Sequence, residues 1–405
     1  MNKTARRVSQ AGFTLIELMV SLAIGLLIVL ALVALLVNVN RNNGELNKTN
    51  RVIENGRVAL QLLQADIVHA GFLGGFIPQF DDLIVATAPI DYPSAVPDPC
   101  LAYTTPWTTA HVQNLFGIAV QSYEIPATVP SPTLSVCANK VVSPKANTDV
   151  LFVRHADNSR NCLTAVAGCP LPKLGELYLQ MARCGSSVPS PAYTFAPYVS
   201  ASAVVDFRMK NRKCNMPQNM PENPAGDVLE DLWRFGSNLY YIRNFAVTAG
   251  DGIPTLMRSK FGFSPAGLLD YMAPEALIEG IEGFRVELGV DDISDSGAAV
   301  NLGAAITWGD SSTKLSPTNR GDGVPDGAYI RCTTAVPCTV AQLANVVALK
   351  LYVLVRSDLA SPGYADVKTY AMGSTSLGPF NDGFKRHLFT QTVRMTNISS
   401  RRETP

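Results

Sequence analysis

The most regular hydrophobic pattern of the chain lies near its start. From Leu18 to Val37 every residue is apolar or small except Ser21, and about 20 such residues in a helix cross a hydrocarbon core of roughly 30 Å. A core helix of a soluble protein would carry polar residues on one face. This segment has none after Glu17. We therefore predict a transmembrane helix over residues 13–40.

A second helical pattern follows the apolar segment. Apolar residues recur every seven positions at Leu46, Ile53, Leu60 and Ile67. This spacing predicts a helical extension over residues 41–75 with one apolar stripe. Gly44 and the asparagines around it are poor helix formers and favour a bend there. The stripe indicates packing on a sheet built by later residues, although a short coiled coil with another protein gives the same spacing.

Alternation with a period of two dominates residues 231–405. In its clearest example, leucines and valines at 349, 351, 353 and 355 alternate with Lys350, Tyr352 and Arg356. This pattern predicts an antiparallel sheet with one buried and one wet face. Residues 76–230 are instead rich in proline and show only short strand patterns. We predict an α+β fold, a long helix on an antiparallel sheet, with residues 76–230 as a disulfide-rich insertion.

Charge sets the orientation of the chain and excludes one class of partner. Lys and Arg total 33 and so do Asp and Glu, so no nucleic-acid partner is predicted. Lys3, Arg6 and Arg7 precede the apolar segment without any acid, which keeps the N-terminus in the cytoplasm and directs the rest outward. The apolar segment is longer than the roughly 7 to 15 residues of a secretory signal peptide, so we expect it to be retained.

All eight cysteines lie beyond the apolar segment, on the side predicted to be oxidising. Disulfides are therefore expected. The absence of any C-x-x-C motif or nearby histidine argues against a zinc site. Among the roughly 100 connectivities that eight cysteines allow, we predict these pairs: Cys162 with Cys169, Cys332 with Cys338, Cys100 with Cys137, and Cys184 with Cys214.

Asp322 and Asp326 are candidate metal ligands. With Gly323 they resemble the end of a calcium loop of the pattern D-x-D-x-D-G-x-x-D. The two upstream acidic positions are occupied by Thr318 and Arg320, which removes half of the carboxylates. We therefore expect no cofactor, and a polar turn is the alternative to a calcium site.

No catalytic motif is found in the sequence. His69, His111, His155 and His387 lack metal-ligand spacing, and no nucleophile or phosphate-loop motif stands in a suitable context. The sequence therefore predicts a protein that is not an enzyme.

One acidic residue, Glu17, interrupts the start of the apolar segment, where a carboxylate is costly. The stretch from Gly12 to Glu17, GFTLIE, resembles the leader signal of type IV prepilins and type II secretion pseudopilins. In that family a peptidase removes the leader after its glycine and the new N-terminus is methylated. The resemblance implies removal of residues 1–12, with cleavage between Gly12 and Phe13 and methylation of Phe13. It implies that Glu17 pairs with the Phe13 amino group of a neighbouring subunit and sets the register of assembly.

Later segments narrow the resemblance to PilW-type minor pilins. Residues 54–71, ENGRVALQLLQADIVHAG, are similar to a stretch of that family, and so are residues 281–291, 321–326, 346–357 and 386–397. The resemblance implies a pilin-like fold and a minor pilin that initiates type IV pilus assembly at or near the pilus tip. Residues 88–226 resemble nothing we recognise.

The same resemblance implies partners and a location. The partners would be other minor pilins, the major pilin, the prepilin peptidase and methyltransferase, and the inner-membrane assembly platform. The chain would lie in the inner membrane with a periplasmic ectodomain, and later in the surface pilus.

Two alternatives remain open at this point. A pseudopilin of a type II secretion system has similar sequence features. A tip-located adhesin is the other alternative, because aromatic residues of the insertion could contact a ligand or fill a local core: Tyr103, Trp107, Tyr123, Tyr193 and Tyr198.

Overall fold

The computed structural model describes residues 12–127, 137, 139–163, 167–183, 191–199, 206–210, 229–314 and 317–403. The chain divides into two compact units, Met1–Arg51 and Val52–Pro405. Helix α1, Leu15–Ile67, contributes its first part to one unit and its last turns to the other.

Helix α1 differs from its predicted form in three respects. It continues without a break through Gly44, and it ends at Ile67 rather than near residue 75. The buried face within the second unit consists of Val52, Gly56, Ala59, Leu60, Leu63 and Ile67. Leu46 and Ile53, which the seven-residue spacing placed on the stripe, are exposed, because the period of 3.6 residues per turn drifts away from a strict seven-residue repeat.

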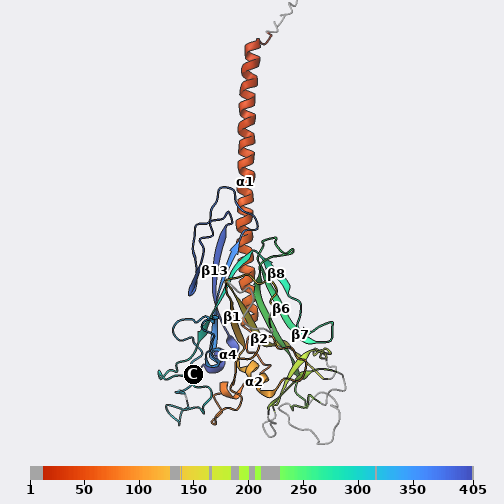
Figure 1. Cartoon of the computed structure of the whole chain (residues 1–405), viewed down its shortest axis with the longest axis vertical. Coiled ribbons are helices and arrows are strands. Elements are labelled where there is room, and N and C mark those ends of the chain that lie inside the picture. The colour runs from red at the N-terminus through yellow and green to blue at the C-terminus, as the bar shows by residue number, and fades with distance from the viewer. Residues whose placement is uncertain are drawn as a thin grey trace, which may run out of the picture. The chain divides into compact units, whose positions relative to one another are not determined.

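The strands of the second unit pair in antiparallel fashion (Figure 1). The larger sheet has the order β1-β2-β5-β3-β4, and β6 pairs with β5, β7 and β8. The bounds of its strands are β1 Val120–Ile125, β2 Thr148–Asn161, β3 Leu177–Met181, β4 Tyr193–Pro197, β5 Leu232–Arg243, β6 Thr255–Phe263, β7 Leu269–Tyr271 and β8 Glu275–Glu279.

A second, three-stranded sheet contributes many of the buried residues in one hydrophobic cluster of this unit. Its order is β13-β10-β9, with bounds Arg386–Arg394, Val346–Arg356 and Ile281–Val290. The odd-numbered residues of β10 from Leu349 to Val355 are buried in one cluster with the last turns of α1. At Gly56 the helix lies so close to β13 that a Cβ atom would overlap the ring of Phe389. The predicted α+β arrangement of helix on antiparallel sheet is confirmed.

The predicted wet face of β10 is wrong. Tyr352 and Leu354 are buried with Tyr370 and Met372. Tyr370 and Met372 are the first and last residues of β11, Tyr370–Met372. This strand forms a hairpin with β12, Thr375–Leu377. A hairpin from more distant sequence therefore covers the second face, leaving Lys350 and Arg356 only partly exposed.

The proline-rich region contributes strands to the same sheet as the later region. Strands β2 and β3, which precede residue 230, both pair with β5, which follows it. Residue 230 thus marks a change of composition rather than a boundary between folding units.

Short helices complete the second unit. They are α2 Thr109–Gly117, α3 Val340–Ala344, α4 Thr396–Arg402 and the 3-10 turn η1 Gln79–Asp81. Helix α4 is held against η1 because Arg401 and Arg402 each donate a 2.7 Å hydrogen bond to the buried carboxylate of Asp81.

Candidate functional site

The start of α1 forms a reciprocal cap. Gly12, Phe13 and Thr14 precede the helix without regular structure. The Thr14 backbone N–H and hydroxyl each donate to Glu17 Oε2 at 2.9 Å, while the Glu17 N–H donates to Thr14 Oγ1 at 3.3 Å. This is a capping box, which satisfies backbone groups that a helix start leaves unpaired. The T-x-x-E spacing from Thr14 to Glu17 is the sequence signal for this cap.

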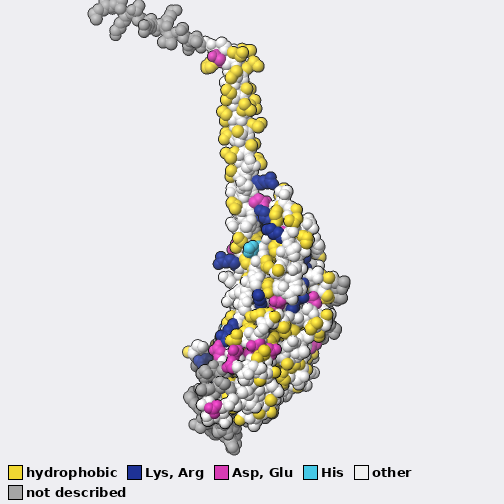
Figure 2. Space-filling model, turned by 90° about the vertical axis from the view of Figure 1, so that its left-hand side faces the viewer, with side chains coloured by type: hydrophobic (Ala, Val, Ile, Leu, Met, Phe, Trp, Pro, Cys, Tyr) yellow, Lys and Arg dark blue, Asp and Glu magenta, His cyan; other side chains and the backbone are white. Residues whose placement is uncertain are grey.

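The segment after the cap is apolar on the whole of its described surface. Helix α1 contains a window with a mean hydropathy of 3.1, and none of it is buried in the structure. Figure 2 shows hydrophobic side chains along the visible face of this segment. By length and composition α1 could cross a membrane.

Three disulfides occur among the described residues. They join Cys100 with Cys137, Cys162 with Cys169, and Cys332 with Cys338, which are pairs proposed from the sequence. Cys184 and Cys214 lie outside the described residues. Cys162 and Cys169 also lie close to Asp231, but as disulfide sulfurs they are not thiolate ligands for a metal.

The two candidate calcium ligands make local hydrogen bonds. Asp326 Oδ2 accepts from the N–H groups of Asp292 and Ile293 at 2.9 and 2.8 Å, and Asp322 Oδ1 accepts from Val324 N–H at 2.8 Å. A third acid, Asp291, directly follows β9 and accepts from Gly323 N–H at 2.9 Å. The sequence pattern of the loop does not indicate this hydrogen bond, because a long stretch of chain separates Asp291 from Asp322.

The aromatic residues considered for ligand binding are buried in the core or pack against it. Tyr193 belongs to one buried cluster and Tyr198 to another. Trp107 and Tyr123 pack against the first of these clusters. Tyr103 also packs there, but it lines a surface hollow as well.

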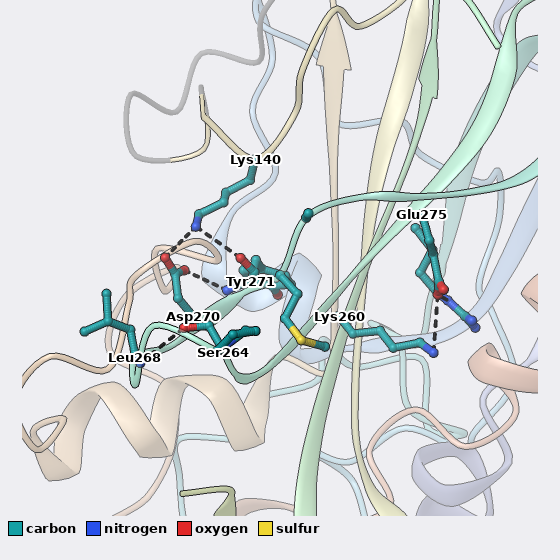
Figure 3. A pocket seen from close by; sticks show the side chains of 11 residues that line it. Lys140, Lys260, Ser264, Leu268, Asp270, Tyr271 and Glu275 are labelled. Atoms are coloured by element: carbon teal, nitrogen blue, oxygen red, sulfur yellow. Dashed lines mark hydrogen bonds and ion pairs between the residues drawn. The ribbon is translucent and has the colours of Figure 1, made fainter. Parts of the chain in front are cut away.

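Two hollows lie on either side of the turn between β6 and β7, and Leu268 lines both. The first, which we call the ionic hollow, has a volume of about 500 Å³. Figure 3 shows Lys140 directed toward Asp270 and the carbonyl oxygen of Tyr271, and Lys260 toward Glu275. Each charged side chain of this hollow therefore has a partner of opposite charge.

The second, which we call the apolar hollow, has a volume of about 730 Å³. Its lining residues are Tyr103, Thr104, Thr105, Pro106, Leu174, Gly175, Phe195, Ala196, Pro197, Val199, Asp206, Phe263, Gly267, Leu268 and Leu269. These residues come from several separate parts of the chain, and no motif in the sequence indicated the hollow.

Comparison with known proteins identifies the family. Residues 7–37 match the model of the prokaryotic N-terminal methylation motif. Residues 239–397 match the family described as type IV pilus-assembly protein W. These two matches support a type IV pilus minor pilin of the PilW type. Pilin and PilW families are structural pilus components and not enzymes, and the N-terminal apolar helix of this chain is consistent with a membrane-anchored pilin.

Other comparisons add little to this identification. Among solved structures, a type IV-like pilin from Thermus thermophilus is similar at 15% identity and a TM-score of 0.16, covering 41% of this chain and 79% of that one. A TM-score this low supports no argument about the fold. No curated protein matches this PilW-type chain in sequence.

Proposed function

We propose that this PilW-type protein helps to initiate type IV pilus assembly and is carried at or near the pilus tip. One observation supports the proposal above all. A methylation motif at residues 7–37 and a pilus-assembly W domain at residues 239–397 occur in one chain. The first is an assembly handle shared by pilins, and the second distinguishes this chain from a filament-forming subunit.

The same proposal includes processing and location. A prepilin peptidase cuts between Gly12 and Phe13, and Phe13 is then methylated. The non-helical backbone at these residues, just ahead of Leu15, would let a peptidase bind them in extended form. Before assembly the helix is anchored in the inner membrane and the ectodomain lies in the periplasm, an oxidising compartment that suits the three disulfides.

In this function Glu17 has two roles that experiments can separate. Its carboxylate caps the helix start through Thr14. After cleavage it also pairs with the Phe13 amino group of a neighbouring pilin, where each charge offsets the cost of placing the other in lipid. The partners are other minor pilins, the major pilin and the inner-membrane assembly platform. We propose no cofactor.

A piliation assay with matched variants tests the proposal. In a strain lacking this chain, we expect electron microscopy to show loss of surface pili and restoration by the wild-type chain. Glu17→Gln keeps the capping geometry but removes the charge, and we expect it to restore fewer than about a tenth of the pili, as a loss of roughly 1.4 kcal/mol or more predicts. Thr14→Ala removes the cap at a cost of about 1 kcal/mol and should restore most pili.

Two results would contradict these proposals. Unchanged pili in the deletion strain would exclude an initiating role and favour a secretion pseudopilin or a tip adhesin. Full restoration by Glu17→Gln, together with failure of Thr14→Ala, would show that Glu17 acts through its cap. The mass of the mature chain checks that both variants are cleaved after Gly12.

A further inference from the structure

The ionic and apolar hollows differ in how their charges are satisfied. In the ionic hollow Lys140 pairs with Asp270, and Arg258 and Lys260 share Glu275 (Figure 3). A ligand entering there would have to displace ion pairs that already exist. This hollow therefore needs no ligand to complete it.

The apolar hollow has one charged lining residue, Asp206, and it is unpaired. In the described part of the chain Asp206 makes no hydrogen bond or ion pair, and its side chain is exposed. It lies near enough to Tyr103 that its negative charge, together with burial, raises the pKa of the Tyr103 hydroxyl. No basic residue lines this hollow, so its electrostatic complement is a cation.

The rim of the apolar hollow exposes large apolar side chains together. The exposed fractions are 62% for Leu174, 61% for Val199, 52% for Leu268 and 42% for Phe263. Single exposed apolar residues are common, but several around one hollow are typical of an interaction site. Covering such side chains stabilises a complex by about 25 cal/mol per Å² of buried apolar surface.

The floor of the hollow is held by the core. The ring of Phe195 stacks on Trp107 with centroids 6.0 Å apart. The Tyr103 N–H donates a 2.9 Å hydrogen bond to the carbonyl of Leu269, which is itself buried. The ring of Phe263 lies against Gly175, where a Cβ atom would meet it at 2.5 Å. A site with such fixed walls binds with less loss of conformational freedom.

We propose that the apolar hollow binds a polypeptide segment of another protein, which inserts an apolar side chain and places a Lys or Arg beside Asp206. A sugar would require more polar partners than the side chains of the hollow offer, which are Tyr103, Thr104, Thr105 and Asp206. Anionic lipid headgroups would be repelled by Asp206. A symmetric contact with a second copy would bring two Asp206 carboxylates together. The proposal does not depend on where in the pilus the chain is located.

Site-specific photo-cross-linking in cells tests the proposal on the full chain. Benzoylphenylalanine replaces Leu174 in one variant and Val367 in the control, which is 69% exposed but lines neither hollow. We expect Leu174→benzoylphenylalanine to cross-link a peptide of another protein that has Lys or Arg within a few residues of the linked position. Adding Asp206→Lys should lower the yield about tenfold, the ratio that corresponds to 1.4 kcal/mol.

Each other result would overturn the inference. A yield at position 174 no greater than at position 367, or a product containing a second copy of this chain, a glycan or a lipid, excludes the proposed partner. So does a yield that Asp206→Lys leaves unchanged. Because Asp206 is exposed, that variant should fold, and an unaltered thermal unfolding temperature of the full chain in detergent verifies this. The cross-link is measured independently of pilus number, so failure here leaves the assembly role untouched.

Discussion

At the scale of single residues, Asp291 is a buried acid whose charge is only partly compensated. Its side chain is fully buried, with a relative exposure of 0%. Oδ2 accepts from Gly323 N–H and lies 3.8 Å from Arg402, whereas Oδ1 has no partner among the described residues. Burial raises the pKa of Asp291 to about 6, and the charges of Asp322 and Asp326 add to this effect against Arg402.

Asp291 should therefore make the protein less stable as the pH rises. A raised folded pKa contributes stability below the unfolded value near 4, and this stability is lost as the pH rises through about 6. Asp291→Asn keeps an oxygen for Gly323 and removes the titration. Between pH 4 and pH 7 we expect the free energy of unfolding of the wild type to fall by up to about 3 kcal/mol because of Asp291. The Asp291→Asn variant should not show this loss. The exposed Asp292→Asn is the control, and equal pH slopes in wild type and Asp291→Asn would contradict the prediction.

Local chemistry was predictable from the sequence at this scale, and distant chemistry was not. The acid in an apolar segment was visible at Glu17, and three local or moderately spaced cysteine pairs were proposed as the structure has them. Asp291 contacts Gly323 in the loop of Asp322 although the two are far apart in sequence, and Asp206 and Phe263 line one hollow from separate parts of the chain. Neither arrangement has a sequence spacing that could reveal it.

At the scale of elements, the carboxylate of Asp66 links the C-terminal end of α1 to the larger sheet by hydrogen bonds. Asp66 accepts hydrogen bonds from Asn238 at 2.9 and 3.0 Å, from Tyr240 at 3.0 Å, and from His155 Nε2 at 2.7 Å. His155 Nδ1 lies 2.9 Å from the Ala156 carbonyl oxygen. Both ring nitrogens thus face acceptors, and both contacts are hydrogen bonds only when the imidazole is protonated.

The attachment of α1 should weaken at alkaline pH. Burial lowers the pKa of His155, but the hydrogen bond and charge of Asp66 outweigh it and raise the net pKa above 6.5. The resulting stability is present in full below pH 6.5 and is lost as the pH rises through the folded pKa.

A substitution of His155 tests this attachment. His155→Leu removes a charge-assisted hydrogen bond and should cost about 2 kcal/mol at pH 6, and much less at pH 9. Thermal unfolding of the full chain in detergent at both pH values measures the difference. His387→Leu, at an exposed position, is the control. A cost that is the same at both pH values would mean that His155 is neutral in the folded protein.

Long strands were predictable from the sequence, and short strands were not. Strand β10, Val346–Arg356, contains the alternating positions 349 to 355 from which a strand was predicted. Strands β4, β7 and β8 are five residues or shorter, too short for alternation to stand out from chance. The wet face expected on β10 failed for another reason, because the hairpin that covers it is specified by residues 370–377 and leaves no trace in the pattern of β10 itself.

At the scale of the whole molecule, the unfamiliar region and the PilW region share one sheet. Along one edge β5 pairs with β2 from Leu151 to Asn161, and along its other edge it pairs with β3 at Tyr178 and Leu179 and with β6. The matched family region begins at residue 239, within β5 itself. Composition changes near residue 230, yet the hydrogen bonds of the sheet cross that position, so the insertion is expected to be required for folding rather than appended to a complete domain.

Fragments of the ectodomain test this dependence. A chain of residues 231–405 would leave backbone groups of β5 unpaired along the edge that β2 occupies and along the part of the other edge that β3 occupies. It would also lose the part of α1 that covers β10. An exposed apolar edge of this kind favours aggregation. We expect this fragment to show no cooperative unfolding by circular dichroism, whereas residues 52–405 should unfold in one transition. The contrary result is cooperative unfolding of the shorter fragment near the unfolding temperature of the longer one. In that case the insertion would be an independent addition, and strands β1 to β4 would pair with β5 without stabilising it.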